Sequence, residues 1–346
     1  MNKVNLVRDV GSLKQTTIKD VARVANVSYA TVSRAISGSP EIGSETRKRV
    51  LQICKQMGYT TNRVAQSMVL KRTQLLGLIV GGVVNPFMSE LAYHIELRAR
   101  ELGYTLMLCN SSNDLELEEH VFKLLLGRQV DGIILLPSHA NTYVKLKDYF
   151  SMVPTVFISE NLRDLPESYV SIDNYRGTRI GTEYLNSLGH KEILYFGCRN
   201  NSVTHQLRVD GYLETCKNMN IQPHVYHSKY NESSIDTGYQ MAMQLFRSPL
   251  AQTAIFAATD SLALGVLGAA EKVGIRVPED LSVMGFDNIT YAGLPKINLT
   301  TIDQPKKTMG FLAVDMLLEK ITDPCVGYSH RILAPVLVER GSCRTL

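Results

Sequence analysis

The sequence predicts an α/β protein in which a small, all-helical N-terminal module precedes a much larger unit of parallel sheets flanked by helices. The first observation behind this prediction is segregated charge: residues 1–72 carry thirteen basic and four acidic side chains, whereas residues 73–346 carry 24 and 29. The second is a change of pattern at Thr73, after which short apolar runs alternate with amphipathic stretches. Such alternation is typical of parallel sheets with both faces covered.

The segment TIKDVARVANVSYATVSRAISG predicts a helix-turn-helix. Thr16 or Thr17 can cap a first helix, because either hydroxyl can accept a bond from an amide of the first turn. The apolar face of this helix has helical spacing and consists of Ile18, Val21, Ala22 and Ala25. After a three-residue break, Ser28 can cap a second helix from about Tyr29 to Ser37. Its inward side chains are expected to be Val32 and Ile36.

A third helix is expected from Ser44 to a C-terminal stop at Gly58, which completes a three-helix core. Its expected buried set is Val50, Leu51, Ile53, Cys54 and Met57. The outward side chains of the second helix suit phosphate and base-edge contacts better than simple solvation, although a small bundle with polar faces is the alternative. With the basic charge, they predict a DNA-binding module whose contact residues are Thr17, Ser28, Tyr29, Ala30, Thr31, Ser33 and Arg34.

Residues 62–71, NRVAQSMVLK, can form one more short helix. With about two and a half turns it is too short to be stable alone in water, so it needs a partner. Met68 is an apolar side chain in a basic segment, and such a residue can insert into a minor groove. Packing of Met68 against the body of the protein is the alternative. The candidate DNA contacts of this segment are Asn62, Arg63 and Met68.

The larger unit is expected to contain two successive runs of strands and helices, and hence two lobes. The predicted strands are 75–80, 104–109, 131–136, 155–159, 169–172, 192–197, 254–258 and 281–286. The predicted helices are 89–102, 115–127, 141–149, 174–188, 205–219, 235–247 and 261–273. In sheets of this kind, ligands bind in the crevice at the carboxyl ends of the strands.

Five residues near those strand ends are suited to a ligand site. Carboxylate and guanidinium groups can each bind neighbouring hydroxyls, and an aromatic ring can cover an apolar face of a ligand. The alternative is ordinary loop and capping chemistry, since Asp and Asn are common turn residues. The candidate effector-binding residues are Asn85, Phe87, Arg208, Asp260 and Asp287.

Composition and motifs argue against other classes of protein. The 346 residues are 45% hydrophobic and 20% charged, and no apolar run reaches the roughly 18 to 20 residues that a membrane span requires. No phosphate loop, nucleophile elbow or His-Glu-x-x-His site is present, so we expect neither an enzyme nor a metal site or cofactor. The pair His224-x-x-His227 is interpreted as two solvent-exposed polar side chains in a connection, not as metal ligands. Six widely spaced cysteines indicate reduced thiols in a cytoplasmic protein: Cys54, Cys109, Cys198, Cys216, Cys325 and Cys343.

From Thr17 onward the chain resembles the LacI/GalR family of bacterial transcription regulators. The helix-turn-helix segment is similar to the family's DNA-reading signature, and GYTTNRVAQSM is similar to its hinge. The sensor landmarks follow in the family's order as NPF, VDGIIL, DN-x-x-G, R-x-x-GY, TD-x-x-ALG, VPEDLSVMGFDN and LTTIDQP. The resemblance implies a headpiece followed by a two-lobed sensor like the periplasmic sugar-binding proteins.

The resemblance also implies roles for individual residues. Base contacts in the major groove fall on Tyr29, Ala30 and Arg34, and the minor-groove wedge falls on Met68, where the family usually has Leu. The ligand-contacting landmarks carry over to Asn85, Phe87, Arg208, Asp260 and Asp287. Family members are typically homodimers whose effectors are sugars, sugar phosphates, purines or nucleosides. Ile158-Ser159-Glu160 departs from the common Ile-Asp-Arg, which alters the pocket. The chain ends at GSCRTL without a leucine-heptad tail, which favours a dimer.

The expected function is therefore a repressor that binds near-palindromic operator DNA under the control of a small-molecule effector, most simply a sugar. The alternatives are a purine or nucleoside effector, or a sugar-binding protein without a DNA role. The expected domains are an extension (1–15), the helix-turn-helix domain (16–60), a hinge helix and linker (61–73), and an effector-binding and dimerisation domain (74–346). Within the last domain we expect the chain to cross between the lobes near 172, 302 and 329.

Overall fold

A computed structural model describes residues 16–36, 39–59, 72–137, 139–158, 166–198, 202–228 and 233–346. The chain divides into two compact units, Met1–Thr73 and Gln74–Leu346. The expected hinge contacts Asn62, Arg63 and Met68 lie outside the described residues, as do the 1–15 extension and the departure at residues 159 and 160.

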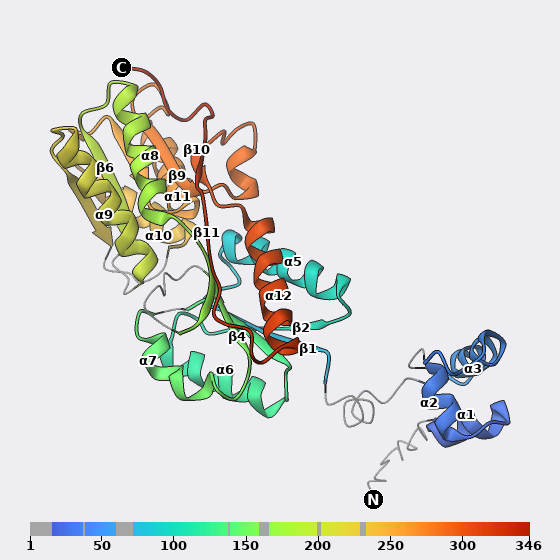
Figure 1. Ribbon diagram of the computed structural model, residues 1–346. Coiled ribbons are helices and arrows are strands. Elements are labelled where there is room, and N and C mark those ends of the chain that lie inside the picture. The colour runs from blue at the N-terminus through green and yellow to red at the C-terminus, as the bar shows by residue number, and fades with distance from the viewer. Residues whose placement is uncertain are drawn as a thin grey trace, which may run out of the picture. The chain divides into compact units, whose positions relative to one another are not determined.

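The first unit contains the expected three helices in its described part: α1 (Ile18–Ala25), α2 (Tyr29–Ile36) and α3 (Ser44–Gln56) (Figure 1). Thr17 caps α1 in a capping box, in which the amide of Asp20 donates to the Thr17 hydroxyl and the amide of Thr17 donates to the Asp20 carboxylate. The Ser28 hydroxyl accepts from the amide of Thr31 at 3.0 Å and so caps α2. The predicted helix-turn-helix and its caps are confirmed.

One core assignment of this unit was wrong, and one core residue was missed. Leu51 is 46% exposed, because the inward face of α3 follows the spacing of Val50 and Cys54, and the neighbouring position points away from that face. In α2, the predicted inward residue Ile36 is half-buried and packs against the core, whereas Ala35, which is only 1% exposed, was not predicted. The small Ala35 allows α2 to approach the other helices closely. The resulting core consists of Val21, Ala22, Ala25, Val32, Ala35, Val50 and Cys54.

The second unit contains two six-stranded sheets in the part of the chain that the structure describes. We call the lobes built on them the β1 lobe and the β6 lobe. The β1 lobe has strand order β11-β5-β4-β3-β1-β2: β11 (His330–Leu333), β5 (Ser168–Ile172), β4 (Thr155–Ile158), β3 (Gly132–Leu135), β1 (Leu75–Val80) and β2 (Thr105–Asn110). The β6 lobe has order β12-β10-β9-β8-β6-β7: β12 (Val336–Val338), β10 (Thr300–Asp303), β9 (Ser282–Asp287), β8 (Ala254–Ala257), β6 (Ile193–Cys198) and β7 (His224–Ser228).

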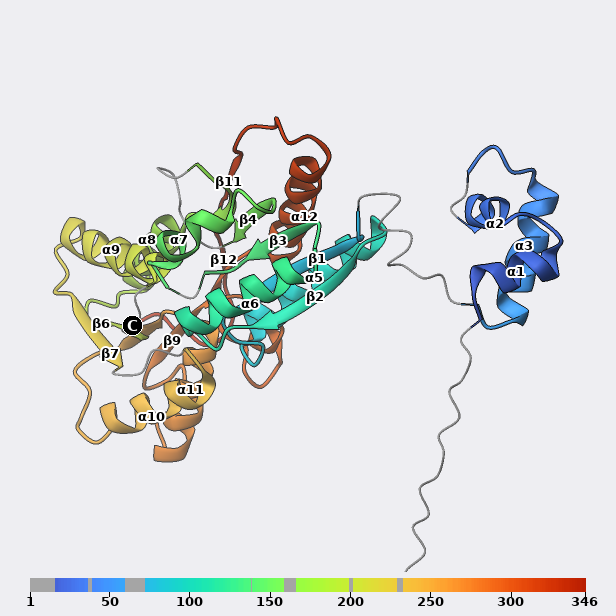
Figure 2. The same ribbon diagram turned by 90° about the horizontal axis from the view of Figure 1, so that it is seen from below.

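The pairing of these strands is parallel except between β10 and β12, as the alternating pattern predicted. The helices of the β1 lobe are α5 (Pro86–Glu101), α6 (Leu115–Gly127), α7 (Thr142–Leu146), η1 (Lys147–Tyr149) and α12 (Lys306–Thr322). Those of the β6 lobe are α8 (Asn174–Ser187), α9 (Val203–Asn218), α10 (Ile235–Leu245), α11 (Asp260–Val273) and η2 (Thr290–Gly293). Helix α12 follows a strand of the β6 lobe but packs against α5 and against β3, β4 and β5 of the β1 lobe (Figure 1). In the β6 lobe, α10 and α11 pack side by side (Figure 2).

Four strands were missed by the sequence patterns. Segment PHVYH, interpreted as a connection, forms the edge strand β7, whose described side chains are half-buried or exposed and therefore lack a continuous apolar run. Strands β10, β11 and β12 are only three or four residues long. Because β11 pairs with β5 of one lobe and β12 pairs with β10 of the other, the last crossing lies between Leu333 and Val336 rather than near residue 329.

Candidate functional site

A cavity with a volume of about 680 Å³ opens between the two lobes, at the carboxyl ends of their strands. This volume is within the range of sites that hold small molecules. The β1 lobe contributes residues 81–88, 110, 112–113 and 136–137 to its wall. The β6 lobe contributes residues 202, 204–205, 208, 233–236, 259, 261 and 287, and Gln304 lies where the chain leaves β10. Among the predicted site residues, the structure brings Asn85, Phe87, Arg208 and Asp287 to this wall.

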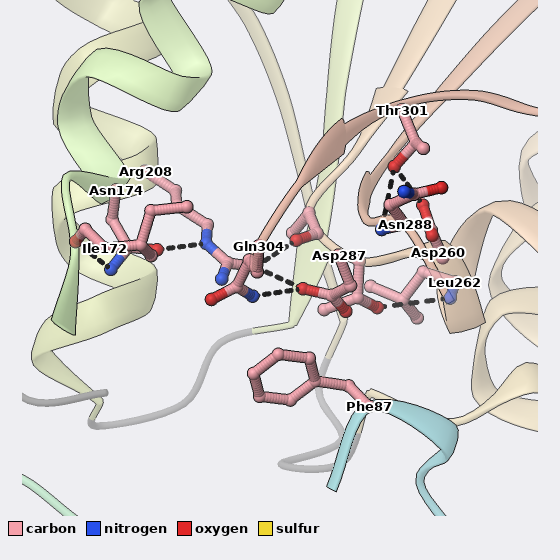
Figure 3. Close-up of polar contacts among 12 residues, drawn as sticks. Phe87, Ile172, Asn174, Arg208, Asp260, Leu262, Asp287, Asn288, Thr301 and Gln304 are labelled. Atoms are coloured by element: carbon pink, nitrogen blue, oxygen red, sulfur yellow. Dashed lines mark hydrogen bonds and ion pairs between the residues drawn. The ribbon is translucent and has the colours of Figure 1, made fainter. Parts of the chain in front are cut away.

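The first turn of α5 presents Phe87 to the cavity. The Asn85 carboxamide oxygen caps the helix by accepting from the amide of Phe87 at 2.9 Å, and Pro86 occupies the first helical turn. The Phe87 side chain is buried in the cavity wall, and its ring projects from α5 toward the side where Gln304 and Asp287 lie (Figure 3). Sequence reasoning had proposed both residues as ligand contacts, and the structure also shows how one orients the other.

Arg208 and Asp287 form a buried ion pair in the opposite wall. The Arg208 Nη1 lies 3.6 Å from the Asp287 Oδ1, and each side chain is only 4% exposed. The guanidinium donates from Nε to the Asn174 carboxamide at 2.8 Å and from Nη1 to the Ala258 carbonyl at 2.6 Å (Figure 3). The central guanidinium carbon, Cζ, lies 3.8 Å from the ring centroid of Phe286. These contacts hold the planar guanidinium in a single orientation.

Asp287 lies in an unusual backbone turn at the end of β9. Its φ is +125° and that of Asn288 is +50°, a region that favours glycine. The Asp287 Oδ1 accepts from the Gln304 Nε2 at 2.6 Å (Figure 3). The Lys306 ammonium donates to the main-chain carbonyls of Asp287 and Asn288 at 2.8 and 2.7 Å. Burial raises the pKa of the Asp287 carboxyl, and the charge of Arg208 and the Gln304 hydrogen bond lower it in part.

Asp260 does not line the cavity. Its carboxylate is fully buried and accepts from the Thr301 hydroxyl at 2.5 Å and from the amide of Ile289 at 2.9 Å. Burial, followed by the negative charge of Asp287, raises the pKa of this carboxyl. In the cavity wall its place is taken by its neighbours Thr259 and Ser261. The Ser261 side chain is 1% exposed, and its hydroxyl has no hydrogen-bond partner among the described residues.

Sequence reasoning missed Ser261, Gln304 and Lys306. A signal for the last two was present, since residues 304–306 follow the LTTID segment directly and therefore leave a strand at the same sheet edge. His205 also lines the cavity, where burial and the charge of Arg208 lower its pKa to about 3, so the ring is neutral.

The predicted DNA contacts in the described part of the first unit lie on α2 or just before it, except Thr17, which caps α1. Tyr29 is 64% exposed, and Ser33 and Arg34 are also exposed. The Arg34 guanidinium forms an ion pair with Glu41 at 3.4 Å. Ala30 and Thr31 are half-buried, and Thr17 and Ser28 act as helix caps.

Other kinds of site were sought in the described residues. None of the helices in the described ranges is both long and apolar enough to cross a membrane. No three His, Cys, Asp or Glu side chains among those residues gather where they could hold a metal ion. His224 forms a hydrogen bond with Glu192 at 2.9 Å.

Comparisons with known proteins agree with this arrangement. Residues 17–62 match the family described as bacterial regulatory proteins, lacI family, and residues 182–343 match a periplasmic binding protein-like domain. The ribose operon repressor of Escherichia coli (strain K12) is 31% identical over 327 residues, which cover 94% of this chain and 99% of the repressor. A crystal structure of the lac repressor dimer bound to operator and the anti-inducer ONPF has a TM-score of 0.85 at 29% identity, covering 96% of this chain and 100% of that one. A LacI family regulator from Enterococcus faecium with bound ribose has a TM-score of 0.71 at 27% identity, covering 79% and 99%. The chain belongs to the lacI family of bacterial regulatory proteins.

Proposed function

We propose that the protein represses transcription as a homodimer on a near-palindromic operator, and that a polyhydroxylated effector in the cavity, most simply a sugar, controls its affinity for DNA. The observation that carries the effector assignment is the buried Arg208–Asp287 pair in the cavity wall. A guanidinium and a carboxylate that lie side by side can together meet the acceptors and donors of adjacent hydroxyls. The unpartnered Ser261 hydroxyl supports the same reading, because a buried hydroxyl without a hydrogen bond is costly until a ligand supplies one.

The DNA-binding half of the proposal is supported by the helix-turn-helix, by the basic charge of residues 1–72, and by the exposed side chains of α2. We assign base readout to Tyr29, Ala30 and Arg34. Supporting contacts to the operator are assigned to Thr17, Ser28, Thr31, Ser33, Asn62 and Arg63. Met68 is assigned the minor-groove wedge. Dimerisation places two such helices on two half-sites, which is why the operator is expected to be near-palindromic.

Selection of bound sequences from random DNA by the purified full chain tests this half. We expect a near-palindromic site to be enriched, and its affinity to fall steeply as salt is added. Binding of sugars without any sequence-selective binding of DNA would instead favour a sugar-binding protein with no regulatory role. The proposal also makes the protein a cytoplasmic regulator rather than an enzyme, so a bound sugar should be recovered chemically unchanged.

Calorimetry with sugars, sugar phosphates and nucleosides tests the effector half. We expect a sugar to bind and to change operator affinity. The second candidate, a purine or nucleoside, is favoured by the buried Phe87 ring, which offers a face on which a base can stack. A nucleoside that binds while every sugar fails would establish that candidate.

A further inference from the structure

Two charged side chains of the β1 lobe hold the turn of the β6 lobe that presents Asp287. The first is Glu90, which lies on α5 one turn beyond Phe87. Its carboxylate accepts from the amide of Thr290 at 2.7 Å. Thr290 lies just beyond the Asp287 turn and is the first residue of η2. This hydrogen bond therefore connects the helix that carries the aromatic wall of the cavity to the loop that carries the acidic wall.

The second side chain is Lys306, the first residue of α12, which packs against the β1 lobe. Its side chain is 9% exposed, and its ammonium contacts the carbonyls of Asp287 and Asn288 and, at 3.5 Å, the Glu90 carboxylate. Two of the three donors of the ammonium are used by the carbonyls, and the contact with Glu90 is an ion pair. The two carbonyls belong to the consecutive positive-φ residues of the turn. Lys306 thus joins Glu90 and the strained turn in one cluster.

We propose that Glu90 and Lys306 are positioning residues for the effector site, which set the placement of Asp287 from the opposite lobe and thereby tie occupation of the cavity to the relative position of the lobes. This inference rests on the proposed effector function of the cavity. A ligand that binds Asp287 contacts a turn that is held by Glu90 of α5 and Lys306 of α12. In the chain, β1 of the same lobe directly follows the linker from the helix-turn-helix unit. A change at Asp287 that reaches the DNA-binding unit through the chain must therefore pass through the β1 lobe.

We call the contacts of Glu90 and Lys306 with the Asp287 turn the link between the lobes. The hydrogen bonds of two amides in the turn distinguish this link from local packing within the β6 lobe. The Thr290 amide donates to Glu90 of the β1 lobe, whereas the Ile289 amide donates to Asp260 within the β6 lobe. Loss of the link should expose the first amide and spare the second. Local unfolding of the turn should expose both. Amide hydrogen exchange resolved at single residues can therefore read the link directly in the full chain, without effector or DNA.

The variants are Glu90→Ala, Lys306→Met and the double variant. We expect each single change to speed exchange at Thr290 by about tenfold, the equivalent of one lost hydrogen bond, while exchange at Ile289 stays within about twofold. Lys306→Met makes the sharper test, because Lys306 does not itself contact the Thr290 amide. Since both residues serve one link, the double variant should exchange at Thr290 no faster than the faster single variant.

Asp315→Asn is the matched control. It removes an ion pair between the same two helices, in which the Arg98 Nε lies 2.8 Å from the Asp315 Oδ1, but both partners belong to the β1 lobe. This variant should leave exchange at Thr290 unchanged. Equal acceleration at Ile289 and Thr290, no effect of Lys306→Met on Thr290, or additive effects in the double variant would overturn the proposal. None of these outcomes depends on DNA or ligand. The exchange experiment can therefore contradict this inference while the proposed function holds, and it can support the inference even if the proposed function is wrong.

Discussion

The Asp260 carboxylate accepts a hydrogen bond from the amide of Ile289, two residues beyond Asp287, so one buried aspartate supports the turn that presents the other. Of these two aspartates, Asp287 lines the cavity and Asp260 does not. Two aspartates that looked equivalent in the sequence are thereby assigned different tasks. The difference leads to distinct predictions for their variants.

Asp287→Ala should weaken effector binding by about 2 kcal/mol or more, because ligand hydroxyls and the Arg208 guanidinium then lose a buried partner. Operator affinity without effector should change little. Calorimetry with the sugar that binds best, alongside operator titration, measures both quantities. Asp280→Asn serves as control, since that carboxylate pairs with Arg276 and lies outside the cavity wall. Unchanged effector affinity in Asp287→Ala would refute the assignment.

Asp260→Ala should lower the free energy of unfolding by about 1 to 3 kcal/mol, because it leaves the buried Ile289 amide and Thr301 hydroxyl without their acceptor. Thr301→Val should cost less, since the Ile289 bond survives. Urea unfolding measures both variants. If Asp260→Ala proved as stable as the parent but lost effector affinity, Asp260 would be a direct ligand contact instead.

Arg34→Ala should cost about 1 to 3 kcal/mol of binding to the selected operator and relax discrimination at one position in each half-site. Anisotropy titrations with operator and random DNA separate base readout from phosphate contact. The control is Arg23→Ala, because Arg23 pairs with Asp20 on α1. Equal weakening on both DNAs would reduce Arg34 to a phosphate contact. Glu41→Ala, which releases the Arg34 guanidinium from its ion pair, should strengthen operator binding.

Stability and effector affinity should respond to pH in opposite directions. An unfolded aspartate titrates near pH 4, whereas burial raises the pKa of Asp260 and Asp287 in the folded protein. Between those pKa values the folded protein binds more protons than the unfolded chain, so the contribution of both groups to stability falls as pH rises through that window. Effector affinity should rise over the same window, because ionised Asp287 accepts hydrogen bonds from hydroxyls.

Asp287→Asn tests this reasoning, since an amide does not titrate. Its effector affinity should be weak and nearly independent of pH, and its free energy of unfolding should lose part of the slope seen in the parent. Urea unfolding and calorimetry over about pH 5 to 8 supply both curves. A parent protein whose effector affinity is flat over this range would contradict the role given to ionised Asp287.

The sequence by itself determined the features that depend on local pattern. Helical spacing and caps between Thr17 and Gln56 predicted the three-helix unit, and alternating apolar and amphipathic runs predicted two lobes of parallel strands. Asn85, Phe87, Arg208 and Asp287 could be placed near one cavity because carboxyl ends of parallel strands meet at one sheet edge. Short edge strands such as β7 and β11 were not predicted, because their described side chains are half-buried or exposed and form no continuous apolar run.

Only the tertiary structure decided which polar groups face the cavity and which support it. Asp260 turns inward because Thr301 and the Ile289 amide supply its hydrogen bonds, and Ser261 lines the wall beside it. Glu90 and Lys306 lie far apart in the chain, and nothing in their local patterns links them. Their contact with one turn follows from the chain returning to the β1 lobe after β10, which places α12 against α5. Such long-range contacts arise from packing of complete elements, and no local residue pattern carries them.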